Sequence, residues 1–159
     1  INDLLIAGNI AAYFGARKPD AVNTHPNIQR LFPNYREVER NFYRRTGIFP
    51  IMHTMVMREE FYRENVWVAE SMYKALEESK RWALEHMRFS GTMRYMVPWL
   101  NTELDEIDEI FGGDPYPYGL EANRKNLETL MQYLVDQGFV AEPRPAIEDL
   151  FTPIVAWSE

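Results

Sequence analysis

The chain has 159 residues, with 17 Lys and Arg against 24 Asp and Glu, a formal charge of −7 and no cysteine. The lack of cysteine excludes disulfide scaffolds, thiolate metal sites and cysteine nucleophiles. The acidic balance argues against nucleic acid as the main partner, because phosphate binding needs a basic footprint. No apolar run is long enough to cross a membrane. We therefore expect a globular chain whose aromatic residues, 14% of the total, pack in a core or face a ligand.

The first 33 residues are predicted to form a helix–strand unit followed by an extended connection. Apolar residues leading into Gly8 indicate the end of a helix with a glycine cap, a helix that would begin before Ile1. Since the chain does not start with Met, we expect it to be a piece of a longer polypeptide. The apolar run 10–14, closed by Gly15, predicts a short buried strand. Such a unit is typical of an α/β sheet.

Residues 34–159 are predicted to form a helix-rich lobe with one buried strand and a C-terminal tail. Apolar residues at helical spacing and glycines at helix ends set the boundaries. The predicted elements are a helix over 34–46, a strand over 49–57, a long helix after Asn65, a helix within 92–111 interrupted by Pro98, a helix ending at Gly138 against which Phe139 packs, and a tail with one helical turn. The expected fold class is therefore α/β and helix-rich.

His53 is the strongest candidate for acid or base chemistry, because it lies inside the apolar run of the second predicted strand. A half-buried imidazole must be hydrogen-bonded, or its desolvation costs free energy. One interpretation is a histidine satisfied by a backbone carbonyl. The other is a general acid or base at a cleft, since the ordinary histidine pKa of about 6.5 lies near working pH.

Arg17 and Lys18 follow the first predicted strand, the place where open α/β sheets hold ligands. An arginine can bind both oxygens of a carboxylate, so an aromatic or doubly charged acid is a suitable ligand. The alternative is two basic residues on an exposed loop. Tyr118, next to Pro117, is predicted either to form a wall of a ligand site or to pack its turn onto the domain.

Metal binding is not predicted. The three histidines, at positions 25, 53 and 86, do not share one face of one element. The acidic segment 103–109 carries an apolar stripe at helical spacing, which favours a solvated helix face over a cation site.

Four stretches of the sequence resemble the C-terminal half of the 4,5-dihydroxyphthalate decarboxylase family: residues 15–21, 30–33, 43–54 and 117–124. The resemblance implies a type II periplasmic-binding-protein-like fold, in which two α/β lobes flank a cleft. It also implies that residues 1–159 are the C-terminal half of such a protein, whose main partner is its own N-terminal half.

The resemblance further implies a cytoplasmic lyase that converts 4,5-dihydroxyphthalate to protocatechuate and carbon dioxide. We expect His53 to protonate the ring, Arg17 to anchor a carboxylate with help from Lys18, and Tyr118 to contact the substrate. No cofactor is expected, because the ring itself takes up the charge. The family is also similar to solute-binding proteins of transporters. The alternative function is therefore capture of a small anionic or aromatic solute in the periplasm, without catalysis.

Overall fold

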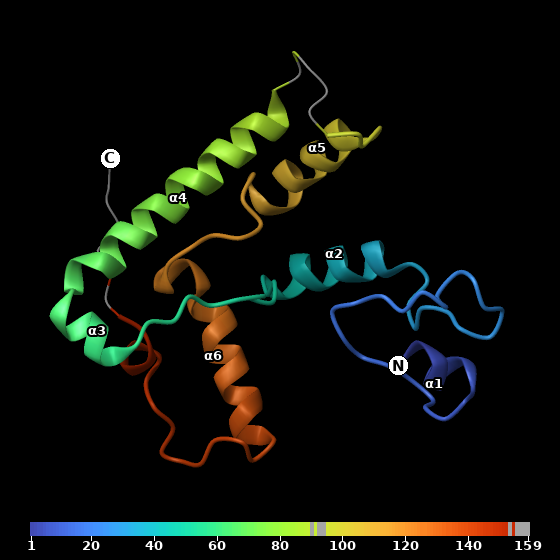
Figure 1. The fold of residues 1–159 in the computed structure, drawn as a ribbon, viewed down its shortest axis with the longest axis horizontal. Coiled ribbons are helices and arrows are strands. Elements are labelled where there is room, and N and C mark those ends of the chain that lie inside the picture. The colour runs from blue at the N-terminus through green and yellow to red at the C-terminus, as the bar shows by residue number, and fades with distance from the viewer. Residues whose placement is uncertain (90, 92–94, 153, 155–159) are drawn as a thin grey trace. The chain divides into compact units, whose positions relative to one another are not determined.

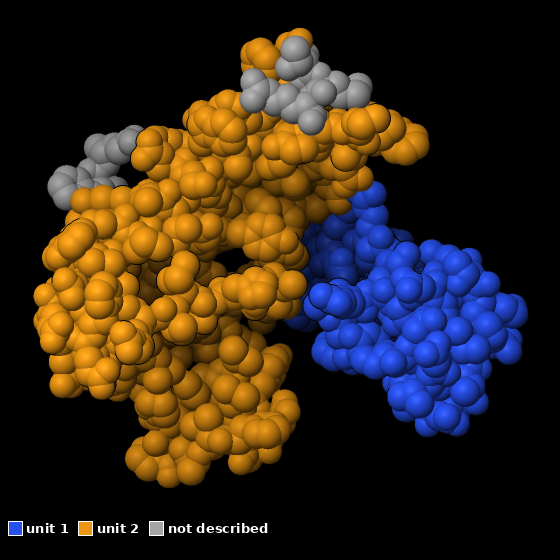
Figure 2. Space-filling model, viewed as in Figure 1, with its two compact units in different colours: residues 1–45 blue, residues 46–159 orange. Residues whose placement is uncertain are grey.

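The computed structural model describes residues 1–89, 91, 95–152 and 154, and in this part the chain is helical (Figure 1). The elements are α1 (Asn2–Ile6), α2 (Tyr35–Thr46), α3 (Glu59–Glu64), α4 (Val66–Arg88), α5 (Leu100–Phe111), α6 (Leu120–Asp136) and the 3-10 helix η1 (Ile147–Leu150). Figure 2 shows two compact units, Ile1–Arg45 and Thr46–Glu159, called unit 1 and unit 2 below.

Both predicted strands are wrong for the part of the chain that the structure describes. Residues 10–14 form bends and irregular backbone, and residues 49–57 are irregular as well, with no strand pairing. A strand needs a neighbour for its N–H and C=O groups, and an apolar, β-branched composition does not supply one. The described part is therefore helix-rich rather than α/β. Helix α3 was not predicted, although Glu59 and Glu60 in its first turn suit a helix N-terminus.

The predicted helix ends are confirmed where a glycine follows the apolar stripe. After α6, the N–H of Phe139 donates to the carbonyl of Leu134 at 2.8 Å and that of Gly138 donates to Val135 at 2.9 Å. These are the two bonds of a Schellman ending, and Gly138 has the left-handed φ of 76° that it needs. The predicted packing of Phe139 is wrong, because its side chain is 76% exposed.

The predicted ranges of α2, α4 and α5 are confirmed in part. Helix α2 matches the predicted range within one residue, and α4 begins directly after Asn65. Helix α5 begins at Leu100, after Pro98, and ends at Gly112, whose φ is 67°. The start of the predicted range, residues 92–94, lies outside the described residues.

Unit 1 is held together by a side chain of α1. The Asn2 side-chain oxygen accepts the backbone N–H of Ala21 at 2.8 Å. Ala21 and Val22 are buried, and the hydroxyl of Thr24 donates to the carbonyl of Asp20 at 2.8 Å. The tight turn that follows Arg17 and Lys18 is therefore attached to the short helix α1 that precedes them.

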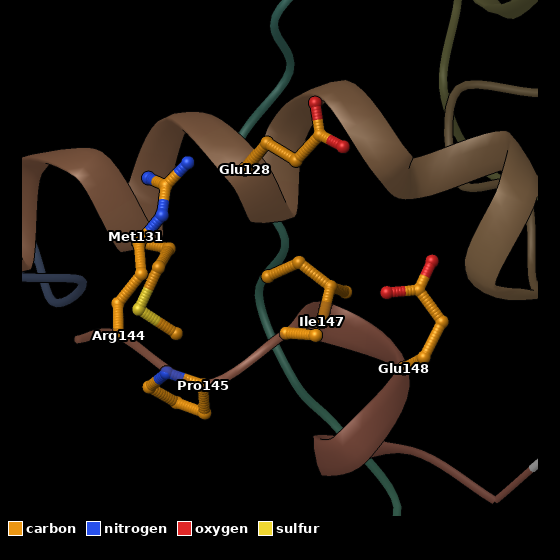
Figure 3. A pocket seen from close by; sticks show the side chains of 7 residues that line it. Glu128, Met131, Arg144, Pro145, Ile147 and Glu148 are labelled. Atoms are coloured by element: carbon orange, nitrogen blue, oxygen red, sulfur yellow. The ribbon is translucent and has the colours of Figure 1, made fainter.

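Unit 2 has a small core where α6 meets η1. Met131 and Ile147 are buried there, and Leu104 of α5 is buried as well. Between α6 and η1 lies a cavity of about 170 Å³ (Figure 3). Its lining residues are Glu128, Met131, Arg144, Pro145, Ala146, Ile147 and Glu148. The lining combines apolar side chains with the charged groups of Glu128, Arg144 and Glu148.

Arg124 joins α6 to η1 through ion pairs. Its guanidinium lies 2.7 Å from the carboxylate of Glu148, 2.6 Å from that of Glu121 and 3.5 Å from that of Glu128. The hydrogen bond from Arg124 lowers the pKa of Glu121. The pKa of Glu148 is lowered first by a backbone N–H and then by Arg124. Both carboxylates are therefore more readily ionised in the folded chain.

Acidification is expected to weaken unit 2 through these carboxylates. Because their folded pKa values lie below the ordinary 4.5, their stabilising effect is fully present above pH 4.5 and is lost as the pH falls through the lowered values. The effect is small, since the groups are exposed. Urea unfolding at pH 6 and pH 3 measures this loss of stability.

The Arg124→Met variant should lose less stability between these pH values than the parent, whereas Arg63→Met should match the parent. An equal loss in parent and Arg124→Met would contradict the assignment.

Candidate functional site

The segment that carries His53 is anchored at Phe49. The backbone N–H of Phe49 donates to the side-chain oxygen of Asn126, in α6, at 3.1 Å. Its ring meets the rings of Phe111, at a centroid distance of 5.0 Å, and Tyr116, at 5.4 Å. The segment between α2 and α3 is thus attached to α6 and to the loop after α5, four residues before His53.

His53 itself is exposed, as are all residues from 51 to 56. The expectation of a half-buried imidazole is therefore wrong, because it depended on a strand that the described residues do not form. The imidazole makes no hydrogen bond or ion pair with another described residue, so no described backbone carbonyl satisfies it. The catalytic role of His53 stays a prediction.

Tyr118 lies in the loop 112–119 between α5 and α6, and a lysine of α4 covers part of its ring. The ammonium nitrogen of Lys80 lies 4.1 Å from the ring centroid. The side chain of Asn123 donates to the carbonyls of Pro117 at 2.7 Å and Gly119 at 2.9 Å, on either side of Tyr118. The Tyr118 residue remains 39% exposed. The turn is therefore packed onto the domain while some of the ring surface stays accessible.

Lys80 is a functional candidate that sequence reasoning missed. Its ammonium group donates to Asp114 at 2.7 Å, to Glu77 at 3.2 Å and to the carbonyl of Tyr116 at 3.3 Å. Burial lowers its pKa, but the hydrogen bonds to Asp114 and Glu77 outweigh burial, so the pKa is raised. In the sequence Lys80 belongs to the charged face of a helix, and no local signal connects it to Asp114.

Arg17 and Lys18 lie in unit 1, and both are exposed. No strand precedes them, so the argument that places ligands beyond strand ends does not apply in the described structure. Neither residue makes a hydrogen bond or ion pair with a described residue. The segments that carry His53 and Tyr118 do meet, because the ring of Phe49 in the first segment contacts the ring of Tyr116 in the second.

Among the described residues, no three His, Asp or Glu side chains gather closely enough to hold a metal ion. In the same part of the chain, no helix has the length and apolar character that a membrane crossing requires.

Comparison with known proteins confirms the resemblance. No protein-family model matches the sequence. The chain is 29% identical over 124 residues to 4,5-dihydroxyphthalate decarboxylase from Comamonas testosteroni. The similar region covers 77% of this chain but 38% of that protein. The similar region therefore spans well under half the length of that relative.

Proposed function

We propose, from this likeness, that the chain belongs to an enzyme that removes a carboxylate from an aromatic dicarboxylate. The observation that carries the proposal is the 29% identity across 77% of the chain to a decarboxylase. The substrate we assign is 4,5-dihydroxyphthalate, and the products are protocatechuate and carbon dioxide. The enzyme would work in the cytoplasm.

The chemistry of this substrate supports a route through a proton donor. Each carboxylate is para to a hydroxyl, so the phenol or phenolate pushes electron density onto the carbon that bears the carboxylate. That carbon accepts a proton, and its bond to the carboxylate then breaks. The electron pair of the broken bond returns to the ring, and carbon dioxide leaves. One proton replaces one carbon dioxide, and the ring serves as the electron store.

Four side chains are given roles in this reaction. His53 donates the proton. Its imidazole is exposed and makes no hydrogen bond or ion pair with a described residue that would compete with the substrate. Arg17 holds a carboxylate through two parallel hydrogen bonds, and Lys18 adds positive potential. Tyr118 supports the ring.

We further propose that residues 1–159 form the C-terminal half of a two-lobed, type II periplasmic-binding-protein-like enzyme, with a helix unit and connection over 1–33 and a helix-rich lobe over 34–159. The other half would cover apolar side chains near His53 that are now exposed. Met52 is 62% exposed, Met55 67% and Val56 85%. Exposed apolar groups of this size, gathered in one segment, are typical of an interface.

Incubation of the full-length protein with 4,5-dihydroxyphthalate tests the function. We expect loss of the diacid and release of carbon dioxide in a one-to-one ratio. Tight binding of a diacid that is recovered intact would instead identify a solute-binding protein and overturn the enzymatic assignment.

A further inference from the structure

The proposed reaction gives no role to Lys80, whose ammonium group lies over the ring of Tyr118. We propose that Lys80 is a positioning residue that fixes Tyr118 as a stacking platform for the aromatic ring of the substrate. This inference rests on the proposed function and adds to it the residue that distinguishes aromatic from saturated diacids.

Lys80 is held in place more firmly than a surface lysine. Its side chain is only 14% exposed. Two carboxylates, of Glu77 and Asp114, and the carbonyl of Tyr116 accept its three N–H bonds. A lysine that donates all three protons has little freedom to leave the Tyr118 ring, whose centroid lies 4.1 Å away.

The backbone on both sides of Tyr118 is held as well. Asn123 binds the carbonyls of Pro117 and Gly119. Gly119 has a φ of 93°, which a residue with a side chain adopts only under strain. The ring is therefore fixed both by its own backbone and by the ammonium group on its face.

A cation on one face of an aromatic ring changes the other face. The ammonium group draws π-electron density toward itself, so the opposite face becomes less negative. Such a face stacks well on the negative π face of another aromatic ring, which an aromatic diacid has and a saturated diacid lacks. Tyr118 is 39% exposed as a residue, and the proposed stacking uses the ring face opposite Lys80.

The charge around Lys80 indicates that this site takes the ring and not a carboxylate. One ammonium group lies beside the two carboxylates of Glu77 and Asp114, so the cluster carries a net negative charge. A substrate carboxylate would be repelled there. In the proposed function, Arg17 binds the substrate carboxylate. Tyr118 would then contact the ring and favour aromatic over saturated diacids.

Calorimetric titration of the full-length protein with two diacids tests the inference. Phthalate and cis-cyclohexane-1,2-dicarboxylate both carry two neighbouring carboxylates, but only phthalate has a ring that stacks. We expect the parent to prefer phthalate, and Lys80→Met to lose this preference by about three- to ten-fold. Lys80→Arg should keep it, because arginine also places a cation over the ring. Lys74→Met, which removes an exposed ion pair with Glu70 of the same helix, is the matched control and should behave as the parent.

The outcomes separate the two proposals. An unchanged preference in Lys80→Met, or an equal loss of affinity for both diacids, would overturn the positioning role alone. A parent that binds neither diacid would overturn the stacking role, whereas the proposed function fails separately if 4,5-dihydroxyphthalate releases no carbon dioxide. Nuclear magnetic resonance checks the contact without any ligand, because the Tyr118 ring should shift the ε-methylene protons of Lys80 upfield. The same shift in parent and Tyr118→Leu would show that the contact is absent and would also overturn the inference.

Discussion

Replacement of His53 by glutamine is expected to lower the rate of decarboxylation by about a hundred- to ten-thousand-fold. Glutamine has a similar size and hydrogen-bonds through its amide, but it does not deliver a proton to the ring carbon. The affinity for substrate should stay within a few-fold of the parent. Because His53 is exposed and has no described partner, its replacement should leave the thermal midpoint unchanged. Single-turnover kinetics and calorimetry measure the two quantities separately.

His86→Gln is the matched control for this prediction. The ring of His86 stacks on Trp82 at a centroid distance of 3.7 Å, and its Nδ1 lies 2.7 Å from the Trp82 carbonyl. Its role is therefore local to α4, and turnover should be unaffected. If His53→Gln turned over substrate as fast as the parent, the assignment of the proton donor would be wrong.

Replacement of Arg17 by methionine is expected to weaken binding of the diacid by about ten- to a hundred-fold, the equivalent of roughly 1.5–3 kcal/mol for charge-assisted hydrogen bonds. Arg17→Lys should bind with intermediate affinity, because lysine keeps the charge and loses the paired geometry. Lys18→Met should have a smaller effect, since that residue is assigned only to the electrostatic field. Equilibrium titration with 4,5-dihydroxyphthalate gives the three affinities.

Arg30→Met removes the same charge from unit 1 and serves as the control. The guanidinium of Arg30 lies 4.4 Å from the centroid of the Tyr35 ring, so it is engaged within its own unit. Its loss should leave affinity for the diacid close to that of the parent. Equal affinities in parent and Arg17→Met would remove Arg17 from the site.

Local patterns in the sequence predicted most of the helices. The helix ends at Gly8, Gly112 and Gly138 can be predicted from nearby residues alone. Each glycine adopts the left-handed conformation that commonly ends a helix. The apolar stripe of α4 likewise depends on residues three and four positions apart. Such signals lie within one or two turns of the chain, so a single sequence contains them.

Other features depend on residues far apart in the sequence, and these were not predicted. The predicted strand over 49–57 failed because pairing requires a second strand, and composition does not reveal whether one is present. The anchor of this segment joins Phe49 to Asn126, 77 positions away. The bidentate pair between Arg88 and Asp108, at 2.6 and 2.5 Å, and the pair between Lys80 and Asp114 are also formed between different elements. Tyr118 was proposed as a site residue from its local motif, whereas its contact with Lys80 was not predicted.

The anchor at Phe49 sets a limit on where His53 can act. Four residues of fully extended chain reach at most about 14 Å, so the His53 Cα lies within that distance of the Phe49 Cα, and the imidazole reaches one side-chain length further. Phe49 itself is held by Asn126 of α6 and by the rings of Phe111 and Tyr116. The proposed proton donor is therefore a tethered group whose range is set by α6 and the loop after α5, and we expect a change at Asn126 to move it without touching the substrate.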